Sequence, residues 1–388
     1  MTEVTTSPVP ERPRMKIEKR EIGHAQGDGP GPTLIVVAGV HGNEPAGILA
    51  ARRVFARLGR GGIDLAGDLW VFAGNLAALQ MGVRYQKKDL NRLWQEDRVT
   101  EVKALAKPDP EDRELKELLG AIEGAMGYAR GKIFLGDFHT SSAHGIPFVL
   151  FGDTLPQRRF VEAFPLPVVM GLEEQVDGVL SSYWTRRGCV TFGCEGGQHD
   201  DPGSVDNLEA VLWLAMEQAG LVEKGSTPEL GRSRGVLEEK RGDLPPWLEV
   251  VSRHAITAKD EFRMEPGFRC LDHAVKGQLL ARDRNGEIRA KSDGMVILPL
   301  YQGLGDDGFF WGRKVSRARL ATSSVLRHMH LDKLLAALPG VTRDVGHPSR
   351  FIVDTHVASV YPLDVFHMFG YRKVREDGER LTVERQPG

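Results

Sequence analysis

The chain has 388 residues, of which 41% are hydrophobic and 27% charged, and its net charge at pH 7 is −2. These values are ordinary for a globular protein, and the length suits two or three domains of about 150 residues each. The near-neutral charge gives no global field that would attract nucleic acid or an anionic membrane surface. No uninterrupted apolar run approaches the roughly 18 residues of a membrane-spanning helix. We therefore predict neither nucleic acid nor membrane as a partner.

The N-terminal segment and the cysteines bear on the compartment. Residues 1–15 are polar, contain three prolines and lack an apolar signal core, which predicts a disordered arm. The three cysteines, Cys189, Cys194 and Cys270, form no CxxC pair and no even set for disulfides. A reduced, cytoplasmic location is the expectation. The sequence leaves open whether the chain forms a homo-oligomer.

Strand-like and helical segments alternate over the first 220 residues. Thr33–Val40 is a near-continuous apolar run, which predicts a strand covered on both faces, and Pro45 suits the first turn of a helix over Ala46–Leu58. The other elements predicted in this part are strands at Asp68–Ala73, Lys132–Phe138, Ile146–Phe151 and Val190–Cys194 and helices from Pro110 to about Met126 and over Ser204–Ala219. Such alternation predicts an α/β domain over residues 16–225, with a mixed, mainly parallel sheet flanked by helices.

The composition changes near residue 222. Residues 226–248 are polar and contain Gly, Ser and a Pro-Pro pair, which predicts a linker. Short strand-like runs follow, with Asn285-Gly286 between two of them as a hairpin-turn signal. A small β domain is therefore predicted over residues 249–315.

The last part of the chain, residues 316–388, gives mixed signals. It contains a predicted helix over Ser324–Leu338, a predicted strand over Phe351–Val360 and a polar end. We interpret it as a C-terminal α/β extension.

Three side chains at strand ends are candidate metal ligands. His41 and Glu44 follow the first strand and are separated by two residues, so they face the same side of a tight turn or first helical turn. His139 ends the strand at Lys132–Phe138, and sites gather at the carboxyl ends of strands in open α/β sheets. Two His and one Glu can bind zinc and leave a fourth position for water. Asp137 is a predicted partner of His139. A surface His beside a capping Glu is the competing interpretation, since HxxE is frequent by chance.

A polar segment after the second strand is a candidate anion-binding site. Arg84 and Arg92 offer planar guanidinium groups, which can hold a carboxylate through two hydrogen bonds or polarise a carbonyl. Asn91 can add an amide donor. Because Lys87 and Lys88 lie between these residues, a basic surface loop is the competing interpretation.

Glu195 is the candidate general base. It follows the apolar strand at Val190–Cys194 and is itself followed by glycines. A Glu beside a zinc-activated water can accept its proton and pass it to a leaving nitrogen. A loop or helix-capping Glu is the alternative. His199 is near enough in sequence to lie at a pocket rim, although we interpret it as an ordinary polar or packed histidine.

Taken together, these residues resemble the succinylglutamate desuccinylase/aspartoacylase family, a branch of the zinc carboxypeptidase-like fold. The resemblance covers roughly residues 33–220. Its pieces stand in the family's order and are His41-Gly-Asn-Glu44, Gly74-Asn75, Arg84-Tyr85, Asp89-Leu-Asn91-Arg92, Asp137-Phe-His139-Thr140 and Glu195-Gly196. The combination is specific, although each piece alone is not. A small β domain after the first domain is also similar to the family's layout, in which it narrows the pocket.

The resemblance implies roles for the matching residues. It implies one zinc ion per chain, bound by His41, Glu44 and His139. It also implies that Glu195 is the catalytic base and acid and that Arg84 polarises the scissile carbonyl. The residues that it implies for substrate binding are Asn91, Arg92, Asn75, Arg187 and Tyr301. For the pocket arginine the sequence does not choose between Arg186 and Arg187.

The sequence thus predicts a zinc-dependent hydrolase that cleaves the amide of a small, anionic N-acyl amino acid or related compound. Two departures from the family, His139-Thr-Ser-Ser and the Gly-Gly-Gln after Glu195, are expected to affect substrate fit. One alternative is a metallocarboxypeptidase acting on peptides, which would need a more open cleft. The other is a zinc-binding protein without turnover, against which the presence of Glu195 argues.

Overall fold

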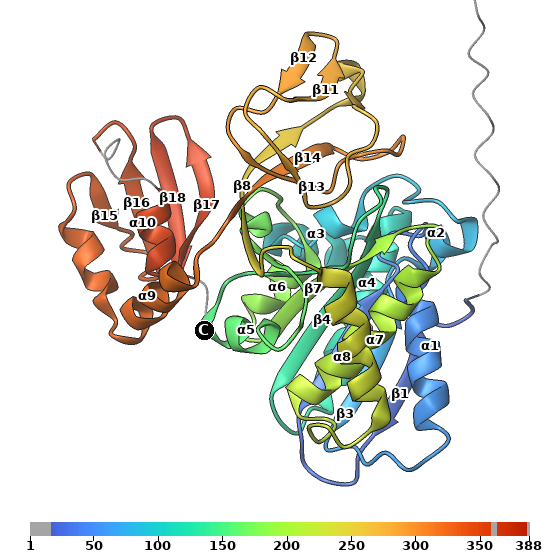
Figure 1. Ribbon diagram of the computed structural model, residues 1–388. Coiled ribbons are helices and arrows are strands. Elements are labelled where there is room, and N and C mark those ends of the chain that lie inside the picture. The colour runs from blue at the N-terminus through green and yellow to red at the C-terminus, as the bar shows by residue number, and fades with distance from the viewer. Residues whose placement is uncertain (1–16, 358–362, 386–388) are drawn as a thin grey trace, which may run out of the picture.

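Residues 17–357 and 363–385 are described by the computed structural model, and they form three units (Figure 1). A large α/β unit carries a small β-rich unit above it in that view, and a C-terminal unit lies beside both. The predicted disordered arm, residues 1–15, lies outside the described residues. So do residues 358–360 of the strand predicted over Phe351–Val360.

Among the described residues, an eleven-stranded sheet runs through the first two units. In spatial order its strands are β1 (Glu21–Gln26), β3 (Asp68–Ala73), β2 (Thr33–Ala38), β4 (Ile133–Ser141), β7 (Val190–Gln198), β5 (Phe148–Phe151), β6 (Val168–Met170), β8 (Trp247–Ala255), β14 (Asp307–Lys314), β13 (Gly294–Ile297) and β10 (Asp272–Ala274). The neighbours β3, β2, β4 and β7 pair in parallel, whereas β5 is antiparallel to β7. The α/β fold with a mainly parallel sheet, as predicted, is confirmed.

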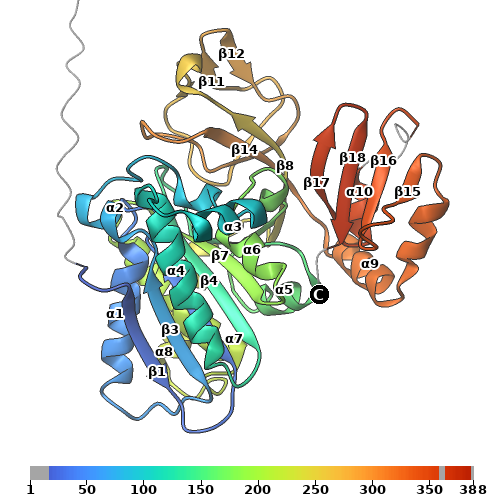
Figure 2. The same ribbon diagram turned by 180° about the vertical axis from the view of Figure 1, so that it is seen from behind.

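Helices cover both faces of the central strands. One face is covered by α1 (Ala46–Leu58), α7 (Gly203–Ala219) and α8 (Pro228–Arg241), which lie in front in Figure 1. The other is covered by α3 (Glu96–Ala104), α4 (Pro110–Gly127) and α6 (Leu180–Thr185), and α4 lies in front in Figure 2. Leu34 and Val36 of β2 join the core under α1 and α7, while Ile35 and Val37 join the core under α4. Alternation of side chains along a strand explains why β2 is apolar throughout.

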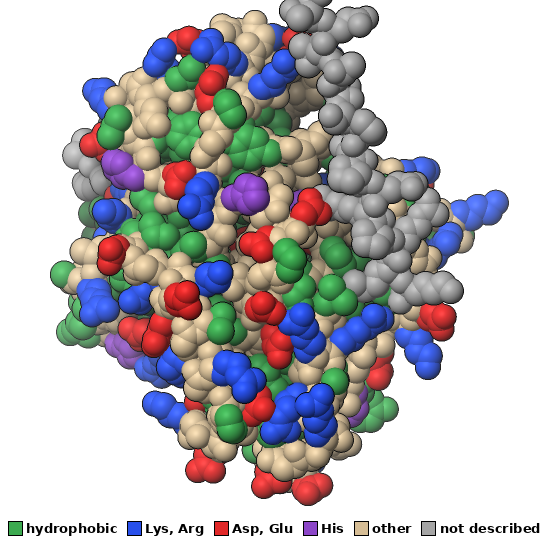
Figure 3. All heavy atoms as spheres, turned by 45° about the vertical axis from the view of Figure 1, so that its right-hand side comes forward, with side chains coloured by type: hydrophobic (Ala, Val, Ile, Leu, Met, Phe, Trp, Pro, Cys, Tyr) green, Lys and Arg blue, Asp and Glu red, His purple; other side chains and the backbone are tan. Residues whose placement is uncertain are grey.

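Two short helices complete the large unit: α2 (Leu76–Met81) and α5 (Leu155–Val161). None of the helices formed by the described residues is long and apolar enough to cross a bilayer. On the face shown in Figure 3, basic and acidic side chains are interspersed, in keeping with the net charge of −2.

Most of the segment predicted as a linker, residues 226–248, is helical and packed against the large unit. It forms α8, which packs on α7 through an ion pair of 2.7 Å between Arg234 and Glu217. Leu230 and Leu237, at i and i+7, are buried in the main core. Two apolar positions on an otherwise polar helix give only a weak periodic signal, because the partner helix supplies most of the buried surface.

The small β-rich unit is continuous with the large sheet. The start of β8 pairs in parallel with β6, and β8 then pairs in antiparallel fashion with β14. A three-stranded sheet of β12 (Gly286–Arg289), β11 (Leu279–Asp283) and β9 (Arg263–Met264) completes the unit. Asn285-Gly286 joins β11 to β12, so the predicted hairpin is confirmed.

The C-terminal unit has its own small sheet and core. The sheet order is β15 (Val341–Arg343), β16 (Arg350–Asp354), β18 (Arg380–Arg385) and β17 (Tyr371–Asp377), with helices α9 (Arg317–His328) and α10 (Leu363–Met368) against it. The helix predicted over Ser324–Leu338 has the wrong bounds. Ser316 caps α9 by accepting from the Arg319 amide at 3.2 Å, and the left-handed His330 separates α9 from a 3₁₀ helix at Leu331–Ala337.

Candidate active site

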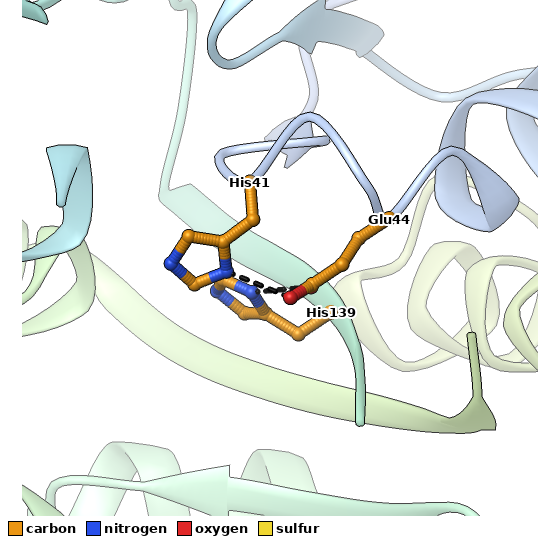
Figure 4. Close-up of side chains that lie close together, drawn as sticks. All are labelled: His41, Glu44 and His139. Atoms are coloured by element: carbon orange, nitrogen blue, oxygen red, sulfur yellow. Dashed lines mark hydrogen bonds and ion pairs between the residues drawn. The ribbon is translucent and has the colours of Figure 1, made fainter. Parts of the chain in front are cut away.

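The loop between β2 and α1 carries His41 and Glu44, and both side chains are buried (Figure 4). Gly42 allows the loop to lie against α2, because a Cβ atom there would stand 2.1 Å from the Ala78 carbonyl carbon. The Gly42 amide donates to the Arg84 carbonyl at 3.1 Å, which ties the loop to the segment after α2. Backbone packing therefore fixes where these two side chains start.

The three predicted metal ligands converge. Nδ1 of His41 lies 2.8 Å from Oε1 of Glu44, and Nδ1 of His139 lies 3.0 Å from Oε2 of the same carboxylate. Candidate ligand atoms of all three residues lie within 4.8 Å of one another. The three side chains point toward one another in Figure 4. Burial alone would raise the pKa of Glu44, but His41 and His139 lower it well below its usual value. The carboxylate is thus charged and faces two imidazoles.

A carboxylate holds the other nitrogen of each imidazole. Nε2 of His41 lies 3.0 Å from Oδ1 of Asp89, and Nε2 of His139 lies 3.0 Å from Oδ2 of Asp137. This pattern fixes the ring orientation and leaves Nδ1 directed at a common point, as in zinc sites where a carboxylate orients the histidine. The predicted pairing of Asp137 with His139 is confirmed. Two His and one Glu in this arrangement fit a zinc ion.

Glu195 stands beside this group because β4 and β7 are paired in parallel with His139 opposite Glu195. Among the described residues its Oε2 is buried without a hydrogen-bond partner. Burial raises the pKa of Glu195 to about 7, against the opposing charge of His139. A carboxyl with that pKa can accept and release a proton near neutral pH, as a general base and acid must.

Arg84, Asn91 and Arg92 also line the cavity at this site. Arg84 donates from Nη2 to Asp89 at 3.0 Å and from Nη1 to Glu44 at 3.4 Å. The Asn91 carbonyl oxygen accepts from the Leu180 amide at 2.9 Å, which leaves its amino group 3.3 Å from Nε2 of His139. Arg92 donates from Nη2 to Asp307 of β14 at 2.8 Å.

Three predicted substrate-binding residues do not reach the cavity. Asn75 is fully buried and caps α2, where its Oδ1 accepts from the Ala78 amide at 3.0 Å. Arg187 stacks 3.5 Å from the Tyr183 ring centroid and pairs with Glu96 on the surface. The Tyr301 hydroxyl donates to the Glu265 carbonyl at 2.7 Å. Arg186 is exposed and does not line the cavity either.

The reason for each correction is local. Asn75 follows a strand and precedes a helix, which makes it an N-cap as readily as a ligand. Arg187 lies just after α6 beside two aromatic rings and an acidic helix, which satisfy its guanidinium. Tyr301 points back into its own unit, while its neighbours Leu300 and Gln302 face the cavity.

The cavity measures about 160 Å³ and is lined by residues from both of the first two units. The small β-rich unit contributes Leu298, Pro299, Leu300, Gln302, Gly305, Asp307 and Phe310. His199 lines it too, with Nδ1 2.8 Å from the Thr140 hydroxyl and Nε2 3.3 Å from Gln302. Its position at the pocket rim is confirmed, so treating it as an ordinary histidine missed a residue of the cavity wall.

Sequence reasoning also missed Asp89 and Glu173. Asp89 lies inside one of the motifs, and an acid between two arginines is a signal that could have found it. Glu173 lines the cavity from the 3₁₀ turn Leu172–Glu174, and no pattern in the sequence relates that turn to the site.

The fold and site define a class: an α/β unit with a His-Glu-His group at the carboxyl ends of parallel strands and an adjacent buried glutamate. The model of the succinylglutamate desuccinylase/aspartoacylase catalytic domain family matches residues 30–234, more than half of the chain. The protein belongs to this family.

Individual relatives agree with this assignment. The succinylglutamate desuccinylase of Photorhabdus laumondii is 36% identical over 73 residues, which cover 19% of this chain and 22% of that protein. The corresponding protein of Burkholderia pseudomallei (strain 1710b) is 29% identical over 167 residues, covering 42% and 47%. The chain therefore matches less than half the length of these curated relatives.

Solved structures show the same fold. A succinylglutamate desuccinylase/aspartoacylase from Rhodobacter sphaeroides has a TM-score of 0.56 at 18% identity, covering 75% of this chain and 88% of that one. The product-bound ectoine utilization protein EutE (DoeB) from Ruegeria pomeroyi has a TM-score of 0.55 at 21% identity, covering 74% and 87%.

Proposed function

We propose that this protein is a zinc-dependent hydrolase that removes the acyl group from a small N-acyl amino acid. The observation that carries the proposal is the placement of Glu195 opposite His139 on adjacent strands, next to the converging His41 and Glu44. Family membership supports the same chemistry. Bound zinc would act as a Lewis acid and make water a stronger nucleophile at neutral pH.

The residues of the chain supply the remaining steps. Glu195 accepts the proton of the attacking water and delivers it to the leaving nitrogen, for which a pKa of about 7 is well matched. Arg84 donates to the carbonyl oxygen as negative charge develops on it. Asp89 and Glu44 hold the guanidinium of Arg84 in place.

The proposal includes a carboxylate on the amino-acid part of the substrate. Arg92 and Asn91 line the cavity and can provide donors to such a group. Asp307 holds Arg92 from the small β-rich unit, and the Leu180 amide holds Asn91, so both side chains are oriented before a substrate arrives. Pre-oriented donors reduce the entropy lost on binding.

The size of the cavity favours a small substrate over a peptide. At about 160 Å³ it lies below the range of roughly 300–1,000 Å³ typical of drug-sized ligands. The small β-rich unit narrows it through residues such as Leu300 and Gln302. A carboxypeptidase acting on peptides would need this wall to be open.

Metal analysis together with an activity screen tests the proposal. We expect about one zinc per purified chain and hydrolysis of at least one member of a panel of N-acetyl and N-succinyl amino acids, with slower cleavage of short peptides. Faster cleavage of peptides would favour the carboxypeptidase. Bound zinc with no hydrolysis of any member would favour a binding protein.

The Glu195→Gln variant tests the general base. It should retain zinc and lose roughly 100-fold or more in kcat, because the amide cannot accept a proton. Glu123→Gln, in a half-exposed surface pair with Lys103, is the matched control and should leave kcat unchanged. Near-normal turnover in Glu195→Gln would overturn the assignment of the base.

A further inference from the structure

The cavity extends well beyond the candidate metal site along one face of β7. Thr191, Gly193 and Glu195 are every second residue of this strand, so they lie on the same face of the sheet, and all three line the cavity. At about 3.3 Å per residue, Thr191 is roughly 13 Å from Glu195 along the strand. The cavity therefore has an inner end remote from the residues that cut the amide.

This inner end is polar. Thr185 and Thr191 both line the cavity, and their hydroxyl groups lie 2.6 Å apart. Gln157 donates to the Thr191 hydroxyl at 2.8 Å, so this group of side chains is satisfied within the protein. Glu173 also lines the cavity, from the turn after β6. Its carboxylate, unlike the threonine hydroxyl groups, is not fully satisfied within the part of the chain that the structure describes.

Among the described residues, Oε1 of Glu173 is buried and has no hydrogen-bond partner. The nearby Arg372 is already engaged by other carboxylates. Arg372 donates from Nη1 to Glu174 at 2.6 Å and from Nη2 to Asp153. Burial raises the pKa of the Glu173 carboxyl to about 7, against the opposing charge of Arg372. A buried carboxyl oxygen without a partner is costly, and a ligand in the adjoining cavity could supply the missing donor.

We propose that Glu173 is a specificity-determining residue that binds a basic nitrogen, an amine or guanidinium, on the side chain of the substrate's amino acid. This inference rests on the proposed function and deepens it, since it assigns the substrate to the N-acyl derivatives of basic amino acids. The basic nitrogen belongs to the amino-acid part because simple acyl groups such as acetyl and succinyl carry none.

Binding of free amino acids tests the inference without requiring turnover. Calorimetry on the zinc-loaded protein would compare L-ornithine with L-norvaline and L-lysine with L-norleucine, pairs that differ in the terminal amine. A hydrogen bond to a charged group predicts roughly 10-fold tighter binding of at least one amine of these pairs. Equal or weaker binding of both amines would overturn the inference.

The Glu173→Gln variant links that preference to the residue. It should reduce the amine preference by roughly 10-fold and leave the affinity for the apolar partner unchanged. Glu239→Gln, on the exposed side of α8, is the control and should keep the full preference. A preference that survives in Glu173→Gln would overturn the assignment. If that variant did not fold, the comparison of amines with their apolar partners on the unaltered protein would still decide.

Hydrolysis of the Nα-acetyl derivatives of the same four amino acids separates this inference from the proposed function. An amine preference in binding with no hydrolysis of any acyl amide would overturn the proposed function and support the role of Glu173. Hydrolysis with equal rates and affinities for amine and apolar partners would support the proposed function and overturn the inference.

Discussion

Two buried clusters of charged side chains in the large unit are completed differently. In the first, His41, Glu44 and His139 direct their ligand atoms at one point. In the second, Asp153 is surrounded by Arg158 of α5, Arg327 of α9 and Arg372 of β17. The first cluster can accept a cation from solution, whereas the second already contains its cations as side chains.

The comparison shows how one chain uses buried charge in two ways. Burial would raise the pKa of Asp153, but Arg372, Arg327 and Arg158 hold it far below its usual range. Two of those arginines come from the C-terminal unit, so the cluster joins that unit to the large one. Paired charge here fixes geometry. In the metal-ligand group, Arg84 contacts Glu44 only at 3.4 Å, and the ligand atoms of the three residues remain directed at one point, where a cation can bind.

Removing a ligand should have the largest effect. In His139→Ala we expect zinc to fall from about one per chain to a small fraction and activity to drop on the order of 1,000-fold, since the metal supplies several kcal/mol of transition-state stabilisation. Elemental analysis and a hydrolysis assay measure this. His144→Ala, at an exposed position nearby, should change neither value. Full zinc content in His139→Ala would contradict the ligand set.

The next largest effect is expected when a cation is removed from the arginine cluster around Asp153. Arg372→Met should lower the free energy of unfolding by about 3 kcal/mol, because Asp153 and Glu174 would remain buried without this partner. Urea denaturation measures it. Arg375 and its partner Asp377 are both exposed, so Arg375→Met should lower the free energy of unfolding by at most about 0.5 kcal/mol. Equal losses of stability in both variants would show that Arg372 does not stabilise the buried carboxylates of Asp153 and Glu174.

Acid should weaken the junction of the units. Burial alone would raise the pKa values of Glu174 and Glu249. Arg372 and His367 instead lower the pKa of Glu174 to about 2. His367 and Arg313 lower the pKa of Glu249 to about 2. A lowered pKa stabilises the fold above the unfolded value of 4.5, and this stability is lost as the pH falls from there toward 2.

We expect the free energy of unfolding to fall over that range, with a contribution of about 3 kcal/mol from Glu249. Glu249→Gln should flatten the pH dependence, whereas Glu379→Gln at an exposed turn should not. An unchanged slope in Glu249→Gln would mean that its carboxylate does not contribute to the junction.

The smallest effect tests the corrected role of Asn75. Asn75→Ala should cost about 1 kcal/mol of stability through loss of the α2 cap and leave kcat and KM unchanged. Asn75→Ser keeps an acceptor for the Ala78 amide and should recover most of the stability. A drop in activity shared by both variants would instead return Asn75 to the substrate-binding residues.

Much of the large unit could be predicted from the sequence because its signals are local. The run Thr33–Val40 is apolar since β2 is covered on both faces, and α1 has the predicted bounds. The helix within residues 226–248 could not be predicted from the sequence, because its signal is not local. The helix α8 buries few apolar side chains of its own, and α7 stabilises it from outside.

The sequence by itself determined the chemistry available to this protein: two histidines and two glutamates at or just after the ends of three strands, which parallel pairing brings to one edge of the sheet. The tertiary structure decided which polar residues face that edge. Asn75, Arg187 and Tyr301 find partners elsewhere, whereas Glu173 lines the cavity with an Oε1 that has no hydrogen-bond partner among the described residues. Spacing along the chain cannot settle this, because whether a polar side chain is satisfied depends on neighbours that folding brings from distant segments.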